Sequence, residues 1–308
     1  MPDSPSTPPP PGRLLLTGAS GLVGGALAAR WRALGGEVVE LAHKPRPDAL
    51  TWQPERGELP AEALENIDVV VHLAGATIGQ RWSASSKKLI HDSRVLSTRL
   101  LAERIAARPP AQRPRVFLCA SAIGYYGFQR PDPVDETAGP GKGFLTDVCC
   151  AWEAATTPAS AAGVRTVLAR TGVVLARHGG ALEQLLKVFN MGMAGPAGPG
   201  TQRMSWISLT DAVEALLFLA ANAEMHGPIN LVSPHICTNR ELTEMMGRII
   251  NKSDKAPAPA FMLKMMFGEM ATETILSDLA VRPRRLEEAG FVWQYAGLEA
   301  ALRHELNA

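Results

Sequence analysis

The 308-residue chain is nearly neutral and lacks long apolar runs, and both absences narrow its range of functions. Its 31 Lys and Arg residues almost balance its 30 Asp and Glu residues, which leaves a net charge of +1. Because no strong field attracts a polyanion and no long basic run occurs, we expect no nucleic-acid partner. No apolar stretch approaches the roughly 18 residues of a membrane span, so we expect no membrane partner either.

Cysteines are few, and the N-terminal residues lack the pattern of a targeting signal. The four cysteines form neither a C-x-x-C motif nor a Cys/His set with zinc spacing, so we predict no metal site and expect free thiols. Residues 1–11 are rich in proline and contain no basic segment followed by an apolar one. They are therefore predicted to be a disordered tail, not a signal peptide, and the protein is expected to be cytoplasmic.

The residues after the tail follow a strand, glycine turn, helix and strand pattern. Residues 13–17 form a short apolar run, and a glycine-rich turn follows over residues 18–24. Residues 22–34 form an alanine-rich helix pattern, and residues 37–41 form the next strand pattern. This βαβ context is the one in which a glycine motif predicts a dinucleotide site.

Each glycine of the turn has a separate role in such a site. Gly18 permits the tight turn, Gly21 lets the backbone approach a pyrophosphate, and Gly24 lets the helix pack closely on the sheet. The helix N-terminus then offers free N–H groups to the phosphates, although a glycine turn without a ligand is the alternative. The residues expected to contact the cofactor here are Thr17, Gly18, Ser20, Gly21, Leu22, Val23 and Gly24.

The segment after the second strand indicates which cofactor is selected. NAD-selective proteins place an acidic residue there, which accepts from the ribose 2′-hydroxyl. Here the segment reads Ala42-His43-Lys44-Pro45-Arg46, with cations in place of the acid. Lys44 or Arg46 can make a charge-assisted hydrogen bond to a 2′-phosphate, although a solvated basic loop is the alternative. We therefore predict NADP(H), with His43, Lys44 and Arg46 as contacts.

Alternating strands and helices continue and predict an α/β fold with a doubly wound parallel sheet. The strand at residues 68–75 ends in small residues, so a nucleotide can lie across the sheet edge there, with Leu73, Ala74 and Gly75 as expected contacts. The further expected elements are a helix from about 85 to 107, a strand over 116–120, a helix through Cys149 and Glu153, a strand over 164–169, a strand over 204–207 and a strand over 229–232.

These elements predict a Rossmann domain over residues 12–175, with returning segments at about 204–233. Residues 176–203 and 234–308 are expected to form a smaller C-terminal lobe that completes a cleft for a small-molecule substrate. A helix predicted over residues 261–279 is rich in methionine, for which packing in the core or between lobes is expected.

A series of motifs runs along nearly the whole chain after the tail. They are Thr17–Gly24, His72–Gly75, Arg81-Trp82, Ser93-Arg94-Val95, Ser121–Gly127, Gly143-Phe144, Trp152-Glu153, Arg170–Leu175, Gly179–Leu182, Gln202 with Ser205–Ile207, Arg282-Pro283 and Gly290-Phe291. This series resembles the atypical short-chain dehydrogenases labelled "epimerase family protein". The resemblance implies the extended short-chain dehydrogenase fold, NADP(H) binding and a C-terminal helical lobe, and it supplies no substrate.

Two arginines in these motifs, Arg94 and Arg170, are expected to contact the cofactor. Arg94 lies where many extended relatives carry an Asn near the nicotinamide ribose. A cation at this position can bind a cofactor phosphate or an anionic substrate, and a structural salt bridge is the alternative.

The Tyr and Lys pair of ordinary dehydrogenases is missing. Those enzymes hold the pair four residues apart on one helix face, where Lys lowers the pKa of the Tyr phenol. Counting back from Glu153 places the pair near Leu145 and Cys149, and neither residue can replace it. Tyr126 and Arg130 have the right spacing, but Gly127 between them and Pro131 directly after them argue against a shared helix face.

Two functions are consistent with this pattern. In the first, an enzyme uses Ser121 to bind the substrate oxygen and Tyr125 or Tyr126 as the acid, unless these tyrosines form only a packed aromatic turn. In the second, the protein binds NADP(H) without turnover, as a sensor or an assembly protein. Cleft residues that favour a ligand, unless they are surface or seam residues, are Arg81, Trp82, Arg203 and Trp206. The sequence is compatible with both a monomer and a homodimer.

Overall fold

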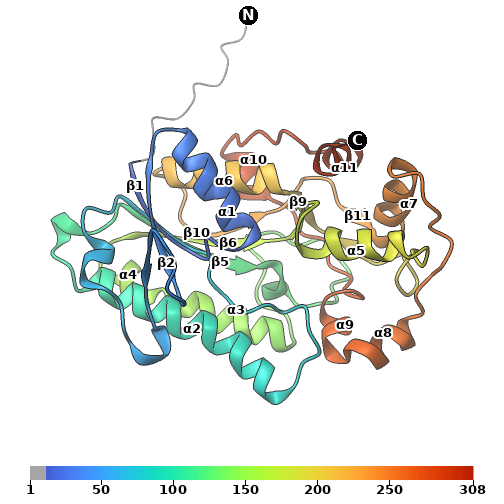
Figure 1. Ribbon diagram of the computed structural model, residues 1–308, viewed down its shortest axis with the longest axis horizontal. Coiled ribbons are helices and arrows are strands. Elements are labelled where there is room, and N and C mark those ends of the chain that lie inside the picture. The colour runs from blue at the N-terminus through green and yellow to red at the C-terminus, as the bar shows by residue number, and fades with distance from the viewer. Residues whose placement is uncertain (1–11, 308) are drawn as a thin grey trace, which may run out of the picture.

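A seven-stranded parallel sheet forms the centre of the protein, seen in the computed structural model, which describes residues 12–307 (Figure 1). The strand order is β10-β6-β5-β4-β1-β2-β3. The chain therefore adds β2 and β3 on one side of β1, and then adds β4, β5, β6 and β10 on the other side. This arrangement confirms the predicted doubly wound fold. The strands are β1 (Arg13–Thr17), β2 (Glu37–Ala42), β3 (Ala49–Thr51), β4 (Val69–His72), β5 (Val116–Ala122), β6 (Arg165–Thr171) and β10 (Gly227–Leu231).

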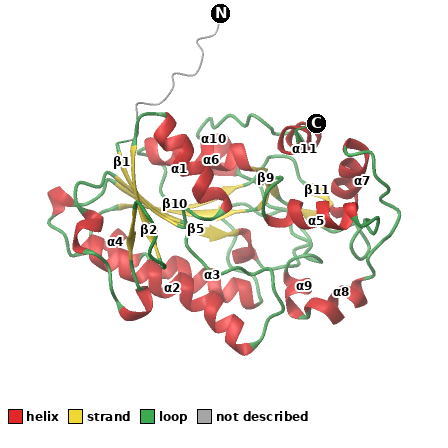
Figure 2. Ribbon diagram, viewed as in Figure 1, coloured by secondary structure: helices red, strands yellow, loops and turns green. Residues whose placement is uncertain are grey.

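Helices cover both faces of this sheet (Figure 2). Leu14 and Leu16 of β1 pack on one side, in a cluster with residues of α1 (Leu22–Ala33) and α6 (Leu209–Ala221). Leu15 packs on the other side, with residues of α2 (Ala84–Ala106). Because both faces are buried, the central strands β1, β4 and β5 contain continuous apolar runs rather than an alternating pattern, which explains why they are recognisable in the sequence. The remaining helices on the second side are α3 (Phe144–Ala154) and α4 (Thr157–Ala161).

The chain beyond β6 adds two small sheets and a group of helices. β7 (Val173–Leu175) pairs in parallel with β9 (Trp206–Ser208), and β8 (Arg203–Met204) pairs antiparallel with β11 (Cys237–Thr238). The helices here are α5 (Gly180–Asn190), α7 (Asn239–Ile249), α8 (Ala260–Phe267), α9 (Glu269–Glu273), α10 (Arg284–Glu288) and α11 (Leu298–Leu306). Short 3₁₀ turns are η1 (Pro54–Arg56), η2 (Ala61–Leu64), η3 (Pro110–Gln112) and η4 (Ile123–Tyr126).

Two elements differ from the sequence prediction. The single strand expected over residues 204–207 is divided at Ser205, whose hydroxyl accepts from Val281 N at 2.7 Å, so β8 and β9 join different partners. The single helix expected over residues 261–279 is also wrong. Gly268 has a φ of +62° and separates α8 from α9, and α9 ends at Glu273.

The methionine-rich face of α8 is exposed, which contradicts the expected burial. Phe261, Met265 and Met266 are 70%, 66% and 57% exposed, and no residue of α8 is buried. The apolar composition of this short helix therefore does not reflect a place in the core.

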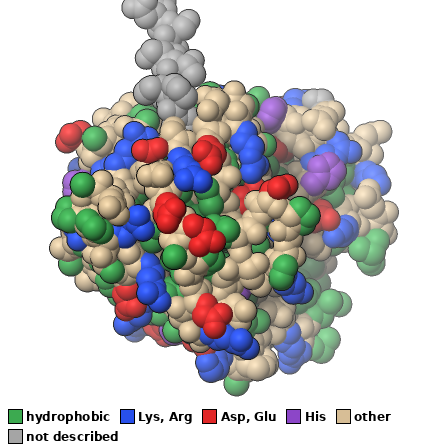
Figure 3. Space-filling model, turned by 60° about the vertical axis from the view of Figure 1, so that its left-hand side comes forward, with side chains coloured by type: hydrophobic (Ala, Val, Ile, Leu, Met, Phe, Trp, Pro, Cys, Tyr) green, Lys and Arg blue, Asp and Glu red, His purple; other side chains and the backbone are tan. Residues whose placement is uncertain are grey.

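The surface and the helices agree with the low net charge and the lack of long apolar runs. Acidic and basic side chains are interspersed on the face drawn in Figure 3. Within residues 12–307, no helix is both long and apolar enough to cross a membrane. The predicted disordered tail, residues 1–11, lies outside the described residues.

Candidate functional site

The turn between β1 and α1 leaves space that only glycine can leave. A Cβ added to Gly24 would lie 2.2 Å from the carbonyl oxygen of Gly18, and one added to Gly18 would lie 2.8 Å from the carbonyl carbon of Leu73. Gly18 also has a φ of +76°, which favours glycine. The turn is therefore pressed against both the helix and the neighbouring strand end.

The N-terminus of α1 is open to an anion. Gly21 is the N-cap residue and has no side chain to cap the helix, and the first turn contains no acidic residue. Ser20 and Gly21 are exposed and Leu22 and Val23 are partly buried, so solvent reaches the helix end at which the unpaired N–H groups of the first turn lie. Together with the positive end of the helix dipole, these groups form an arrangement that suits a phosphate.

A buried hydrogen-bond network joins this turn to the end of β4. The Thr17 hydroxyl accepts from Leu73 N at 3.2 Å and Ala74 N at 3.1 Å, so its own proton goes to His72 Nδ1 at 2.7 Å. His72 then carries its proton on Nε2, which donates to Ser97 Oγ at 3.0 Å. Burial lowers the pKa of His72 to about 3, so the ring is neutral. The network fixes the expected crest residues Leu73 and Ala74 beside the glycine turn, with Gly75 exposed next to them.

The basic segment after β2 lies at the other side of β1 and is partly neutralised. Arg46 forms an ion pair with Glu40, which also pairs with Arg32 at 2.7 Å. Sequence reasoning overlooked Glu40, because it precedes the end of β2 and only the fold directs its side chain to Arg46. Lys44 is exposed and, within residues 12–307, has no carboxylate partner. His43 is exposed as well, and its ring centroid lies 5.6 Å from that of Trp52.

Arg94 is a residue of α2, and its side chain reaches the loop that follows β4. Its Nη1 donates to the carbonyl oxygens of Ala76 and Ile90, both at 3.0 Å. No acidic side chain in the described part of the chain pairs with Arg94, so the salt-bridge alternative is wrong. Burial lowers the pKa of Arg94.

Ser121, Glu153 and Arg170 meet at the carboxyl ends of β5 and β6. Arg170 is 3% exposed and forms a double ion pair with Glu153, at 2.8 Å from Nε and 2.7 Å from Nη2. Ser121, opposite Arg170 in the sheet register, donates its hydroxyl proton to Glu153 at 2.7 Å. Although burial by itself would lower the pKa of Arg170, its hydrogen bonds and charge contact with Glu153 raise it.

Tyr126 extends this network and is fully buried. Its hydroxyl accepts from Arg170 Nη1 at 3.0 Å and donates to Asn230 Oδ1 at 2.8 Å, so its proton is already committed. Burial raises the pKa of Tyr126, which further disfavours loss of this proton. The expected failure of Tyr126 and Arg130 to share a helix face is confirmed, because η4 ends at Tyr126 and Arg130 binds its carbonyl oxygen.

Tyr125 differs from Tyr126 in exposure and in bonding. It is only partly buried, and its hydroxyl has no hydrogen-bond partner among residues 12–307. The guanidinium carbon of Arg170 lies 3.4 Å from its ring centroid, which places a positive charge against the aromatic face. Of the three predicted catalytic residues, Tyr125 is therefore the one with an uncommitted hydroxyl.

Helix α3, which would carry the Tyr and Lys pair, has a buried thiol at the expected lysine position and a cap from another segment at its start. The Cys149 thiol is buried and lies 3.7 Å from the Ala122 carbonyl oxygen, and burial raises its pKa to about 12. The start of α3 is instead capped from a distant segment. Glu273 of α9 accepts from Phe144 N at 2.8 Å and Leu145 N at 2.9 Å.

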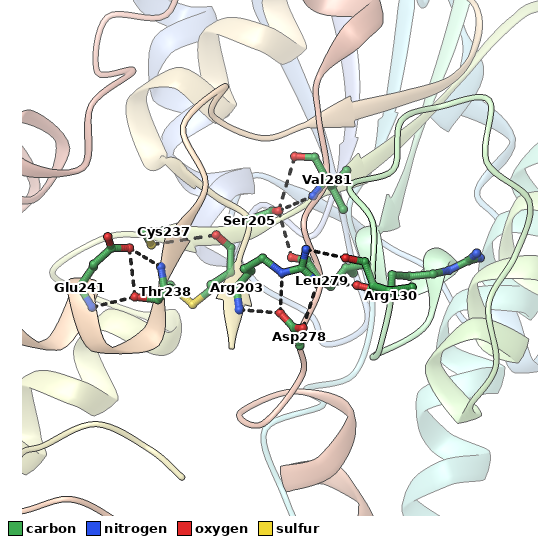
Figure 4. A network of polar contacts seen from close by, with 11 residues as sticks. Arg130, Arg203, Ser205, Cys237, Thr238, Glu241, Asp278, Leu279 and Val281 are labelled. Atoms are coloured by element: carbon green, nitrogen blue, oxygen red, sulfur yellow. Dashed lines mark hydrogen bonds and ion pairs between the residues drawn. The ribbon is translucent and has the colours of Figure 1, made fainter. Parts of the chain in front are cut away.

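The cleft residues Arg203 and Trp206 are occupied within the protein. Arg203 forms a bidentate ion pair with Asp278, at 2.8 and 2.9 Å, and donates to the Pro131 carbonyl at 3.0 Å (Figure 4). Ser205 connects the same segment to Val281, and Trp206 is fully buried. The interpretation as a seam residue therefore fits Trp206, whereas Arg203 is held by Asp278 and is not the surface arginine of its alternative interpretation. Nearer the surface, Arg81 donates to the Met265 carbonyl and Trp82 packs on Phe144.

Comparisons with known proteins cover nearly the whole chain. Residues 14–250 match the model of the NAD dependent epimerase/dehydratase family, and residues 258–305 match a domain of unknown function. An epimerase family protein of Mycobacterium leprae is 40% identical over 292 residues, which cover 94% of each chain. The human epimerase family protein SDR39U1 is 32% identical over 296 residues, covering 94% of this chain and 98% of the human one.

Solved structures show the same similarity. The crystal structure of human SDR39U1 (isoform 2) with NADPH has a TM-score of 0.88 and 31% identity, and the match covers 96% of this chain and all of that one. A nucleoside-diphosphate sugar epimerase of Corynebacterium glutamicum has a TM-score of 0.78 and 34% identity, and covers 96% of this chain and 58% of its own. UDP-glucose 4-epimerase of Thermotoga maritima, at 17% identity and a TM-score of 0.76, shares the fold.

Proposed function

The chain belongs to the NAD dependent epimerase/dehydratase family, and we propose that it is an NADP(H)-dependent oxidoreductase acting on a small-molecule carbonyl or alcohol. The observation that carries this proposal is the cradle at the start of α1, where Gly18 and Gly24 leave space that a Cβ would fill. The NADPH in the related human structure supports the same cofactor.

The residues present fit an NADP(H) molecule lying across the sheet edge. Thr17 to Gly24 would hold the pyrophosphate at the open end of α1, and Lys44 with Arg46 would hold the 2′-phosphate beyond β2. The nicotinamide half would then lie on the opposite side of β1, over Leu73, Ala74 and Gly75 of β4 and toward β5. This placement brings it to the side of the site where Ser121 and the two tyrosines lie.

The bound cofactor supplies the hydride, and the protein must handle the proton. In the direction of reduction, we assign Tyr125 as the donor of the proton that the carbonyl oxygen takes up as the hydride reaches the carbon. Ser121 and Tyr126 already donate to Glu153 and Asn230, so neither has a proton to offer a carbonyl oxygen. They are positioning residues, which hold Arg170 against the Tyr125 ring.

The experiment that tests this function has two stages. The purified protein is first titrated with NADPH and NADH in parallel, followed by fluorescence. We expect about tenfold or greater preference for NADPH, because a charge-assisted hydrogen bond contributes roughly 1.5–3 kcal/mol. Equal binding would contradict the role of the basic segment, and absence of binding would overturn the proposal.

The second stage is catalytic. NADPH oxidation is followed by absorbance against a panel of aldehydes and ketones, with Tyr125→Phe as the variant. We expect kcat to fall about 100-fold or more while NADPH affinity stays the same, since general acid catalysis contributes roughly that factor. Full activity of Tyr125→Phe would remove this residue from the mechanism.

A second candidate function is NADP(H) binding without turnover, as in a sensor or an assembly protein. The specific observation in its favour is that Ser121 and Tyr126 have both committed their hydroxyl protons within the protein. Tight NADPH binding with no turnover of any carbonyl in the panel, and none of the corresponding alcohols with NADP⁺, would favour this candidate.

A further inference from the structure

Arg94 is held against the loop that follows β4. A Cβ added to Gly75 would lie 3.0 Å from the guanidinium carbon of Arg94, so glycine at this position makes room for the cation. The two hydrogen bonds from Nη1 to Ala76 and Ile90 fix one corner of the guanidinium plane. Arg94 is therefore placed by the backbone and not by an acidic partner.

The rest of the guanidinium is available to a ligand. Among residues 12–307, Nη2 and Nε of Arg94 have no hydrogen-bond partner. These atoms are also absent from the group of fully enclosed polar atoms without partners, such as Trp152 Nε1, so they are reachable from outside. A partly buried cation with two open donors and no carboxylate nearby is suited to binding a polar ligand.

Arg94 reaches toward the helix on which ordinary dehydrogenases carry their lysine. Its guanidinium carbon lies 5.1 Å from the ring centroid of Trp152 on α3. Cys149, one turn earlier on α3, is the expected position of that lysine. Burial raises the pKa of the Cys149 thiol, and the positive charge of Arg94 is close enough to oppose this effect. Helix α3 therefore brings no cation of its own to this position, since its charged side chains are Asp147 and Glu153, while α2 brings the guanidinium of Arg94.

We infer that Arg94 replaces the missing lysine from a different helix, and that its open edge binds the ribose hydroxyl groups next to the nicotinamide. The inference rests on the proposed function. If the pyrophosphate is bound at α1 and the 2′-phosphate beyond β2, the nicotinamide half would reach Gly75, against which Arg94 is placed. The two adjacent N–H groups of a guanidinium edge match two neighbouring hydroxyl oxygens, which a thiol cannot bind in this way.

The first test separates the two halves of the cofactor. NADPH and 2′,5′-ADP, which lacks the nicotinamide ribose, are titrated against the wild type, Arg94→Met and Arg99→Met. Arg99 is exposed on the same helix, so its replacement removes an equal charge away from the site. We expect Arg94→Met to weaken NADPH about tenfold or more and to leave 2′,5′-ADP within about twofold.

Two outcomes of this test would overturn the inference. Unchanged NADPH affinity in Arg94→Met would mean that Arg94 does not contact the cofactor. An equal loss for NADPH and 2′,5′-ADP, or the same loss in Arg99→Met, would indicate a general effect of charge or folding. If the wild type binds neither molecule, the proposed function fails instead, so the two failures are distinguishable.

The second test asks whether a lysine at position 149 and the guanidinium of Arg94 occupy the same site. Cys149→Lys is made in the wild type and in Arg94→Met, and thermal unfolding and NADPH affinity are measured. In the wild type the new ammonium meets Arg94, so we expect a lower unfolding temperature. In Arg94→Met the new ammonium occupies the space that the Arg94 guanidinium has left, so we expect less destabilisation and a partial recovery of NADPH affinity. Equal destabilisation in both backgrounds without recovery would show that the two positions do not share a site.

Discussion

Replacing Glu153 with Leu should strongly destabilise the protein, because it leaves the Arg170 charge buried without a partner. The two side chains are 10% and 4% exposed, and Glu153 is the only carboxylate within salt-bridge distance of Arg170 in the described chain. Breaking such a buried pair from one side costs about 3–5 kcal/mol. For a chain of this size, that corresponds to a fall of about 5–8 °C in unfolding temperature.

The double variant Glu153→Leu with Arg170→Met tests the reason for this loss. Since it removes both charges, the remaining cost is that of Ser121 and Tyr126 each losing one hydrogen bond, roughly 1–3 kcal/mol in total. The double variant should therefore be more stable than Glu153→Leu alone. Both are measured by guanidinium unfolding at pH 7, with thermal unfolding as a second probe.

An exposed pair provides the matched control. Glu299 and Arg303 lie one turn apart on α11, at 2.8 Å, and are 53% and 52% exposed. Glu299→Leu should change the free energy of unfolding by less than about 0.5–1 kcal/mol. The single variant Arg170→Met completes the cycle at the buried pair. If the cost of the double variant equals the sum of the costs of Glu153→Leu and Arg170→Met, the reasoning from uncompensated charge is wrong.

Three further predictions test other parts of the structure. Lys44→Ala with Arg46→Ala should weaken NADPH about tenfold or more in a fluorescence titration and leave NADH unchanged, because only NADPH carries the 2′-phosphate; a loss for both cofactors would contradict this. His72 has a pKa of about 3 when folded and an ordinary value near 6.5 when unfolded, so the unfolded chain binds one more proton between these values. Stability should therefore fall as pH drops from about 6.5 to 3, and His72→Gln should show a shallower fall in denaturant unfolding. Phe261→Ser with Met265→Ser on α8 should change unfolding free energy by less than about 1 kcal/mol, since a loss of several kcal/mol would mean that these side chains are buried.

The central sheet could be predicted because its signals are local. A strand buried on both faces appears as a continuous apolar run, as at Val69–His72, and the glycine turn follows β1 directly. The return of β10 to the sheet edge was also predicted from its own residues. The absence of the Tyr and Lys pair needed only a count of residues along one helix.

The partners of the site residues could not be predicted in the same way. Glu153 and Arg170 are both visible in the sequence, but their pairing depends on how α3 packs over β5, the strand next to β6. Glu40 neutralises Arg46 only because the strand directs its side chain there. For α8 the sequence predicted burial where the side chains are exposed, because apolar composition alone does not show whether a short helix packs on the core.

The cap that Glu273 places on α3 has a consequence for the order in which the protein is made. Its hydrogen bonds to Phe144 and Leu145 span 129 and 128 residues. At roughly 5–20 residues per second, a ribosome needs on the order of ten seconds to synthesise that interval. During this time the first turn of α3, the helix that carries Glu153, is without its cap. A nascent chain that stops before residue 273 would therefore contain the complete glycine turn at α1 but an α3 helix without its N-terminal cap.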